Sequence, residues 1–291
     1  MKIGTWAKIV AIIVVCVLLD VALHLVTSEY STMPENPSYS TVAKSLGVEV
    51  TASLWALLAF SGAAYVYFQF RRAIPGKGIE KGLRYGLAIA LLWLFAMLEG
   101  VALFGNPLIS EFVVGLSDAI PVLTLGILLG LLITESGETV AVQPLALREK
   151  LKAVAVFTGI FLVGRYAAYF AGVIQSGLQT SPCYTFIWTM LMGACIGVVW
   201  ILLGNSGHVL SLRHRAARFG FLVFGVNWAA FLVFMPLLFS GYLVDVLSRI
   251  VLDVLLGERD LASVIQPSVV AGLDVAPSSA DMAGAGLLLY E

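Results

Sequence analysis

The first 26 residues read MKIGTWAKIVAIIVVCVLLDVALHLV, and this stretch decides the class of fold. From Lys8 onward the chain is apolar for about 20 residues, the length that an α-helix needs to cross about 30 Å of hydrocarbon. A signal peptide has an apolar core of only about 7–15 residues, followed by a cleavage site with small residues. This run is longer and no such site follows it, so we predict an uncleaved first membrane helix.

The composition of the whole chain agrees with this prediction. Of the 291 residues, 60% are hydrophobic and 12% are charged, whereas globular domains are about 45–50% apolar and about 25% charged. A water-soluble chain this apolar could not cover its surface with polar groups. We therefore predict an all-α, polytopic transmembrane helical bundle with the lipid bilayer as its main partner. The net charge of −1 offers no electrostatic attraction for nucleic acid, which we do not expect as a partner.

Eight segments are candidates for membrane spans. They lie near residues 5–27, 50–70, 83–104, 110–134, 152–174, 184–204, 218–239 and 242–257. The eighth, YLVDVLSRIVLDVLL (242–256), is short and carries Asp245, Arg249 and Asp253 on one helical face. It is either a true span whose polar face turns into the bundle, or an amphipathic helix that lies at the interface with its charges toward the headgroups.

Basic residues gather in segments that alternating spans place on one side. Most of the 17 Lys and Arg precede the first span or lie between spans 2 and 3, 4 and 5, or 6 and 7, whereas the opposite loops carry only Lys44. By the positive-inside rule we expect a cytoplasmic N-terminus, and a cytoplasmic C-terminus if the eighth segment crosses. Residues 258–291 are rich in Ala, Gly, Ser and Pro, and we expect a flexible tail there.

The two halves of the membrane region, residues 1–134 with spans 1–4 and residues 135–257 with spans 5–8, resemble each other. KGLRYG (81–86) opens span 3 and RAARFG (215–220) opens span 7, and this alignment sets Glu111 against Asp245. NPSYS (36–40) similarly aligns with SPCYT (181–185). The similarity indicates either two parallel four-helix repeats or a chance match, because apolar helices align easily.

Three charged residues lie near the middle of predicted spans, namely Asp20, Asp118 and Arg165. Counting about 1.5 Å per residue from the outer helix ends places each roughly 12–15 Å deep. A charge at such depth costs about 2.5–3.5 kcal/mol, so each is expected to have a structural or functional role. The aligned halves set Asp20 opposite Arg165, and we predict an ion pair between them that clamps the halves or gates a site.

Other polar residues of the spans lie at shallower depth on the same side: Glu99, Glu111, Asp245 and His24. Glu111 and Asp245 occupy the first turns of their helices, where the helix dipole also stabilises a carboxylate. His24, four residues after Asp20, is more typical of an interfacial residue than of a ligand. Glu99 and Asp118 have no basic partner nearby in the sequence, which makes them the strongest candidates for a functional site.

Short motifs in the spans indicate packing rather than catalytic chemistry. GILLG (126–130) and GACIG (193–197) are small-residue motifs that let helix backbones approach. Cys16, Cys183 and Cys195 show no metal-ligand spacing. The sequence also lacks phosphate-loop, HExxH and GxSxG motifs, so we predict no metal centre and no cofactor.

Three hypotheses of different kinds fit these observations. The first is a transporter or channel for a small cation or a proton-coupled solute, with a polar site in the outer half of the bundle. Its ion-binding residues would be Asp118, Glu99, Asp20, Arg165, Glu111 and Asp245. The second is a non-catalytic membrane subunit or scaffold, whose charges are structural ion pairs and whose surface holds a membrane protein partner or a second copy of the chain. The third is an intramembrane enzyme that uses Asp118 or Glu99 as acid or base on a lipid.

Overall fold

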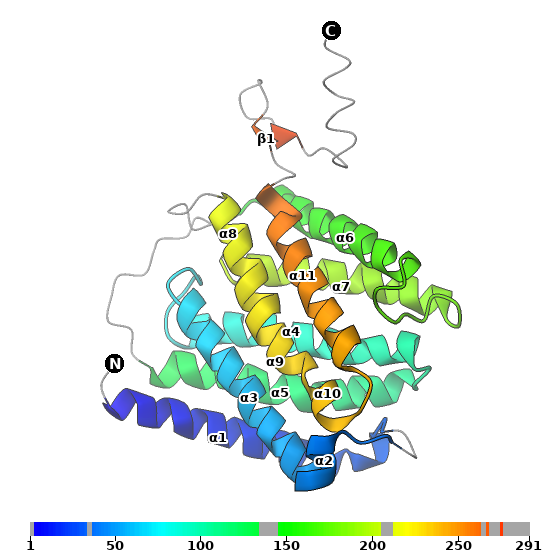
Figure 1. The fold of residues 1–291 in the computed structure, drawn as a ribbon. Coiled ribbons are helices and arrows are strands. Elements are labelled where there is room, and N and C mark those ends of the chain that lie inside the picture. Colours follow the sequence, from blue (N-terminus) through cyan, green and yellow to red (C-terminus); the bar gives the residue numbers. More distant parts are fainter. Residues whose placement is uncertain are drawn as a thin grey trace.

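The computed structural model describes residues 3–33, 37–133, 145–204, 212–262, 266–267 and 274–275. These residues form the predicted all-α bundle (Figure 1). Seven of its helices are long and apolar enough to cross a membrane. Six are single helices: α1 (Ile3–Val26), α3 (Val48–Phe70), α4 (Ile79–Leu103), α5 (Leu108–Leu132), α6 (Leu147–Phe170) and α7 (Pro182–Leu202). The seventh, His214–Leu238, is composite.

The outer surface of the bundle is apolar, as contact with lipid requires. On α1, for example, Leu18 and Leu25 are exposed by 63% and 70%, whereas Ile12 and Cys16 are buried. In water such a surface would be unfavourable, but acyl chains solvate it without cost. Figure 1 shows the start of α1, the turn between α3 and α4 and the start of α8 at one end of the bundle. The cytoplasmic location of that end stays a prediction.

The closest helix pair is α4 and α5, which meet at a seam of glycines. A Cβ atom added to Gly126 would lie 2.5 Å from the Cα of Gly86, and one added to Gly82 would lie 2.3 Å from the carbonyl oxygen of Gly126. Only glycine fits at this distance, so the close packing predicted from GILLG is confirmed. The second motif, GACIG, likewise packs the backbone of α7 against α6, since a Cβ on Gly197 would lie 2.6 Å from the Cα of Val154.

The seventh span is not the uniform helix that its sequence predicts. It consists of α8 (Leu212–Phe219), the π-helix η2 (Gly220–Trp228), α9 (Ala229–Leu232) and α10 (Phe234–Leu238). Pro236 has no backbone N–H, so it cannot donate to the carbonyl of Leu232, and the helix is interrupted at Val233. The π-helix widens the backbone in the half of this span that precedes the interruption.

The segment between α1 and α3 is tied to the end of this span. It contains the short helices η1 (Ser28–Tyr30) and α2 (Thr41–Leu46), and Ser40 caps α2 by accepting a hydrogen bond from the N–H of Ala43. The N–H of Ser40 donates to the carbonyl of Leu238 at 2.9 Å, and the N–H of Ser240 donates to the carbonyl of Ser38 at 2.8 Å. These bonds join the segment between α1 and α3 to the end of the seventh span.

The eighth long helix, α11 (Leu243–Ala262), packs along α8 and η2 and also contacts α6. Its polar stripe faces the protein, because Arg249 and Asp253 are buried, whereas Val244 and Val251 on the opposite face are exposed. An interfacial helix would instead turn its charges to the headgroups. The charges of α11 therefore do not face headgroups, and α11 packs in the bundle, while its crossing of the membrane stays a prediction.

The predicted tail is described in part. The helix α11 continues to Ala262, beyond the predicted end of the eighth span at residue 257. The two-residue strands β1 (Gln266–Pro267) and β2 (Asp274–Val275) pair antiparallel. The rest of the tail predicted over 258–291 lies outside the described residues.

Candidate functional site

The charged residues inside the bundle form two separate groups rather than one converging site. The first group, here called the α1–α5 acid cluster, comprises Asp20 and His24 of α1 with Glu111, Ser117 and Asp118 of α5. The second group, here called the α6–α11 charge cluster, comprises Arg165 of α6, Glu99 of α4, and Asp245, Arg249 and Asp253 of α11. The two groups differ in how their charges are paired.

Ion pairs satisfy most of the α6–α11 charge cluster. Arg165 Nη2 donates to Asp253 Oδ2 at 3.2 Å, and Arg165 Nη1 lies 4.0 Å from Glu99 Oε1. Arg249 Nη1 donates to Glu99 Oε1 at 2.6 Å, and its Nε donates to Asp245 Oδ2 at 2.6 Å. Charge-assisted bonds of this length are the strong kind, and they link α4, α6 and α11.

Backbone and aromatic groups add to this cluster, in which Arg165 Nε, Arg165 Nη1 and Asp253 Oδ1 are buried without a hydrogen-bond partner. The guanidinium of Arg249 donates to the carbonyl of Gln175 at 2.6 Å, and the N–H of Gln175 donates to Asp245 at 2.7 Å. The guanidinium of Arg165 lies 5.1 Å from the ring centre of Phe161 and 5.5 Å from that of Trp188. A fully buried arginine is thus held by acids and by aromatic faces.

These contacts correct two sequence predictions. The predicted ion pair between Asp20 and Arg165 is wrong, because α1 packs on α3 and α5 whereas α6 packs on α7 and α11. Glu99 also has a basic partner, Arg249, which is distant in the sequence and adjacent in the fold. Equal depth in the membrane says nothing about which helices are neighbours.

The α1–α5 acid cluster has a different character. The Oδ1 atoms of Asp20 and Asp118 face one imidazole, at 3.9 Å from Nδ1 and 3.7 Å from Nε2 of His24, respectively. Both aspartates are buried, and neither Oδ1 atom has a hydrogen-bond partner. Within the described part of the chain, no Lys or Arg forms an ion pair with them. Negative charge therefore gathers here without a fixed cation.

The orientation of the His24 ring adds to the repulsion among the acidic groups of this cluster. Its Nδ1 atom lies 3.0 Å from the backbone carbonyl of Asp20. A carbonyl only accepts, so Nδ1 carries the proton, and in the neutral imidazole Nε2 presents its lone pair to Asp118. Two lone pairs face each other across 3.7 Å. A proton on Nε2 or a bound cation would remove this repulsion.

Polar groups continue from this point toward the loop between α4 and α5. Ser117 and Thr27 hydroxyls lie 3.0 Å apart across the α1–α5 interface. One to two turns nearer the start of α5, Asn106 donates to Glu111 Oε1 at 2.5 Å, while Glu111 Oε2 is buried without a partner. The Glu111 carboxylate lies against Gly100 of α4, where an added Cβ would approach Oε1 to 2.0 Å.

A proline adds an oxygen to the same stretch of α5. Pro121 lies inside the helix and has no N–H, so the carbonyl of Ser117 lacks the bond that residue 121 would normally give it. This carbonyl belongs to the residue before Asp118. Ligand oxygens of three kinds (carboxylate, hydroxyl and carbonyl) therefore occur within two residues of α5.

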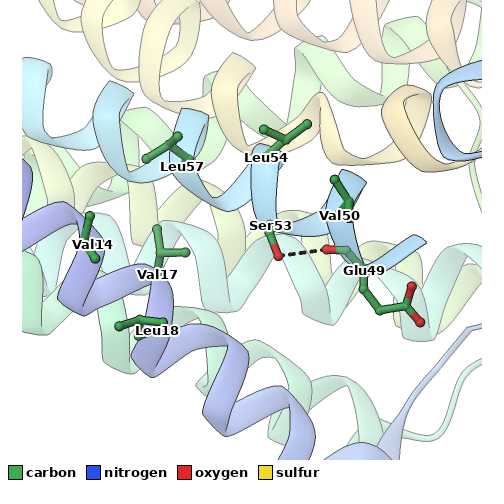
Figure 2. A pocket seen from close by; sticks show the side chains of 8 residues that line it. All are labelled: Val14, Val17, Leu18, Glu49, Val50, Ser53, Leu54 and Leu57. Carbon is green, nitrogen blue, oxygen red and sulfur yellow. Dashed lines mark hydrogen bonds between the residues drawn. The ribbon is translucent and has the colours of Figure 1, made fainter. Parts of the chain in front are cut away.

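A groove between α1 and α3 is not part of this site. Figure 2 shows it lined by apolar side chains of both helices, together with Ser53 and Glu49 near its end. The hydroxyl of Ser53 donates to the backbone carbonyl of Glu49 at 2.8 Å. None of the residues of the α1–α5 acid cluster lines the groove, whose character suits an acyl chain rather than a polar solute.

The site predicted from the sequence included three of the five residues of the α6–α11 charge cluster, Glu99, Arg165 and Asp245, and all three acids of the α1–α5 acid cluster, but not His24. The sequence signal that could have identified His24 is its spacing of four residues from Asp20, which sets the two side chains on one face of α1. The imidazole is half-exposed, as an interfacial residue would be, yet its Nε2 atom faces a buried carboxylate. No known protein family matches the sequence, and neither characterised proteins nor solved structures gave a match.

Proposed function

We propose that the protein is a membrane transporter for a small cation or a proton-coupled solute, with the α1–α5 acid cluster as its cation or proton site. The observation that carries this proposal is the set of three buried carboxylates, of Asp20, Glu111 and Asp118, each with a buried oxygen that lacks a partner. Intramembrane acids are costly and occur mainly where ions or protons pass. An arrangement with excess negative charge is balanced by a cation that comes and goes.

The distribution of polarity along α1 supports access from one end. From His24 toward the loop that follows α1, hydroxyls and the Asn106–Glu111 pair extend the polar stretch. From Asp20 in the other direction, the buried face of α1 is apolar, with Cys16, Ile13, Ile12 and Ile9 in the core. The surroundings of the site are therefore polar toward one side and apolar toward the other, a gradient that fits one state of an alternating-access cycle.

The α6–α11 charge cluster favours a different reading of that part of the molecule. Its charges pair with one another, which is what a structural role predicts. A scaffold made only of such pairs is the second candidate function for the whole chain. It leaves the unpaired acids of the α1–α5 acid cluster without an explanation.

The test is ion movement by the purified protein in liposomes. Capacitively coupled currents would be recorded after concentration jumps of H⁺, Na⁺, K⁺ and divalent cations. We expect at least one of these ions to give a current that is lost in Asp118→Asn, because this change removes a charge from the site. Glu80→Gln is the matched control, since Glu80 is an exposed acid that pairs with Arg84 outside the site.

Two results would count against transport. If no cation gives a current with the wild-type protein, or if the current of Asp118→Asn equals that of the wild type, the α1–α5 acid cluster does not carry ions. A native mass that always includes a second protein would then favour the scaffold.

A further inference from the structure

We propose that the α1–α5 acid cluster binds a divalent transition-metal ion through His24 Nε2 and the carboxylates of Asp20 and Asp118. This inference rests on the proposed cation site and names the class of cation. It goes beyond the sequence prediction, which included neither a metal nor His24 as a ligand.

The three donor groups are already close to a metal-binding triangle. One ligand atom from each of Asp20, His24 and Asp118 lies within 4.8 Å of the other two, and the edge from Nε2 to Asp118 Oδ1 is 3.7 Å. A tetrahedral ion with ligands at about 2.0–2.2 Å holds those ligands roughly 3.3–3.6 Å apart. Small rotations of the side chains would close the remaining distance.

The partner of His24 Nδ1 is of the kind found in metal sites. A histidine that ligates a metal through one nitrogen almost always donates the other N–H to a carbonyl or carboxylate, which fixes the ring and its tautomer. Here Nδ1 donates to the carbonyl of Asp20 at 3.0 Å. The free lone pair of Nε2 consequently faces the Asp118 carboxylate at 3.7 Å before any ion is bound, whereas Asp20 Oδ1 lies 3.9 Å from Nδ1 and must rotate toward the ion.

Charge and donor type favour a divalent transition metal over an alkali ion. The two carboxylate ligands balance two positive charges, so the ion with its three ligands would be neutral in a medium of low polarity. A monovalent ion would leave one negative charge buried. Imidazole nitrogen is a donor that suits Zn²⁺, Cu²⁺, Ni²⁺ and Fe²⁺, whereas Ca²⁺ and Mg²⁺ prefer oxygen alone.

The same arrangement of ligands suits a metal ion that is bound and released rather than held permanently. Three protein ligands leave a fourth position for water or a moving group, whereas closed structural sites use four. His24 is the exposed member, with a side chain 39% accessible compared with 5–6% for the two aspartates. An ion would therefore arrive over the imidazole and reach the buried carboxylates last.

The experiment is a titration of the metal-free, detergent-solubilised full-length protein with Co²⁺, followed by displacement with Zn²⁺. We expect one Co²⁺ per chain, with visible d–d absorption typical of mixed nitrogen and oxygen ligands. His24→Gln and Asp118→Asn should each weaken binding by roughly 10–100-fold, and the nitrogen signature should disappear in His24→Gln. His214→Gln is the control, because His214 lies on α8 outside the cluster.

The readouts separate this inference from the proposed function. Failure of the wild type to bind Co²⁺, or wild-type binding by His24→Gln, overturns the metal site. If currents of H⁺ or Na⁺ still depend on Asp118 in that case, cation transport stands and only the metal is excluded. If Co²⁺ binds as expected but no ion moves, the metal site stands and transport fails.

All variants are compared at equal elution volume and helix content. His24→Gln, which alters the half-exposed ligand, serves alone if Asp118→Asn does not fold.

Discussion

The two charge clusters of this protein both lie inside the bundle, and they differ in whether their acids have arginine partners. In the α6–α11 charge cluster, Arg165 on one helix meets Asp253 on another at 3.2 Å. In the α1–α5 acid cluster, Asp20, which the sequence alignment sets opposite Arg165, meets another acid, Asp118, and His24 lies close to both. A buried charge can be compensated permanently by the fold, as in the α6–α11 charge cluster, or temporarily by a ligand, as we propose for the α1–α5 acid cluster.

The predicted duplication would explain why the two positions correspond. Within the first half α1 packs on α3 and α5, and within the second half α6 packs on α7 and α11. Glu111 and Asp245 lie in the first turns of α5 and α11, as the sequence alignment sets them. The repeat itself stays a prediction, but these neighbour relations are those that it requires.

One helix touches both clusters. Glu99 of α4 accepts from Arg249 in the α6–α11 charge cluster, and the next residue, Gly100, lies against Glu111 of the α1–α5 acid cluster. Adjacent residues of a helix point in directions about 100° apart, so α4 separates the clusters and contacts each with a different face. Substitutions on α4 can therefore disturb one cluster while leaving the other intact.

The largest effect is expected from Arg165→Met. This change leaves Asp253 buried without its main partner, and removing one member of a buried ion pair costs about 3–5 kcal/mol. We expect the free energy of unfolding, measured by reversible denaturation in mixed detergent micelles, to fall by this amount. The double variant Arg165→Met/Asp253→Leu should recover most of the loss, because no uncompensated charge remains. Equal losses in the single and double variants would show that the pair contributes little.

For the α1–α5 acid cluster we expect a smaller change in the free energy of unfolding, and here it is an increase, caused by Co²⁺ binding. Co²⁺ at a hundred times its dissociation constant should stabilise the wild type by about 2.7 kcal/mol, since the ion binds the folded state. Asp118→Asn should lose this increment and, without metal, should be no less stable than the wild type, because a neutral amide replaces an unpaired charge. The same unfolding assay measures both quantities. Asp253→Asn is the counterpart, and it should be destabilised with or without Co²⁺.

The sequence was sufficient for the helices and for the depth of their charges. A run of apolar residues as long as the bilayer core is thick leaves few alternatives, so α1 and α3 to α7 begin and end near their predicted limits. The same reasoning placed Asp20, Asp118 and Arg165 inside the spans. It failed for the seventh span, where the π-helix η2 depends on packing against α3 and α11 rather than on local preference.

The partners of the charges could not be read from the sequence, because they depend on which helices are neighbours. Glu99 and Arg249 form a 2.6 Å contact across a long stretch of chain. Apolar helices of similar length carry no strong signal for pairing, and the glycine seam of α4 and α5 is an exception that its motif revealed. Polar residues in tertiary contact, such as Thr27 with Ser117, leave no local pattern at all.

Glu99→Gln tests whether the two clusters are independent. The amide keeps an acceptor for Arg249 but loses the charge, so we expect a loss of about 1.5 kcal/mol in the free energy of unfolding, the difference between a charged and a neutral hydrogen bond. Binding of Co²⁺ should not change, because Glu99 belongs to the α6–α11 charge cluster. A decrease in Co²⁺ affinity as large as that of Asp118→Asn would show that α4 couples the clusters.

Gly100→Ala is the smallest change and acts on a different face of the same helix. Its methyl group would lie 2.0 Å from Glu111 Oε1, so the flexible carboxylate must move and give up its bond from Asn106, at a cost of about 1 kcal/mol or less. We expect Co²⁺ affinity to fall several-fold, since Glu111 adds negative charge near Asp118. The loss in the free energy of unfolding caused by Arg165→Met should be the same with and without Gly100→Ala.

Gly159→Ala is the control, because no atom lies within 4 Å of its added Cβ. If Gly100→Ala binds Co²⁺ as the wild type does, Glu111 is a capping residue of α5 rather than part of the cation site. The α1–α5 acid cluster would then be reduced to its two aspartates and the histidine between them.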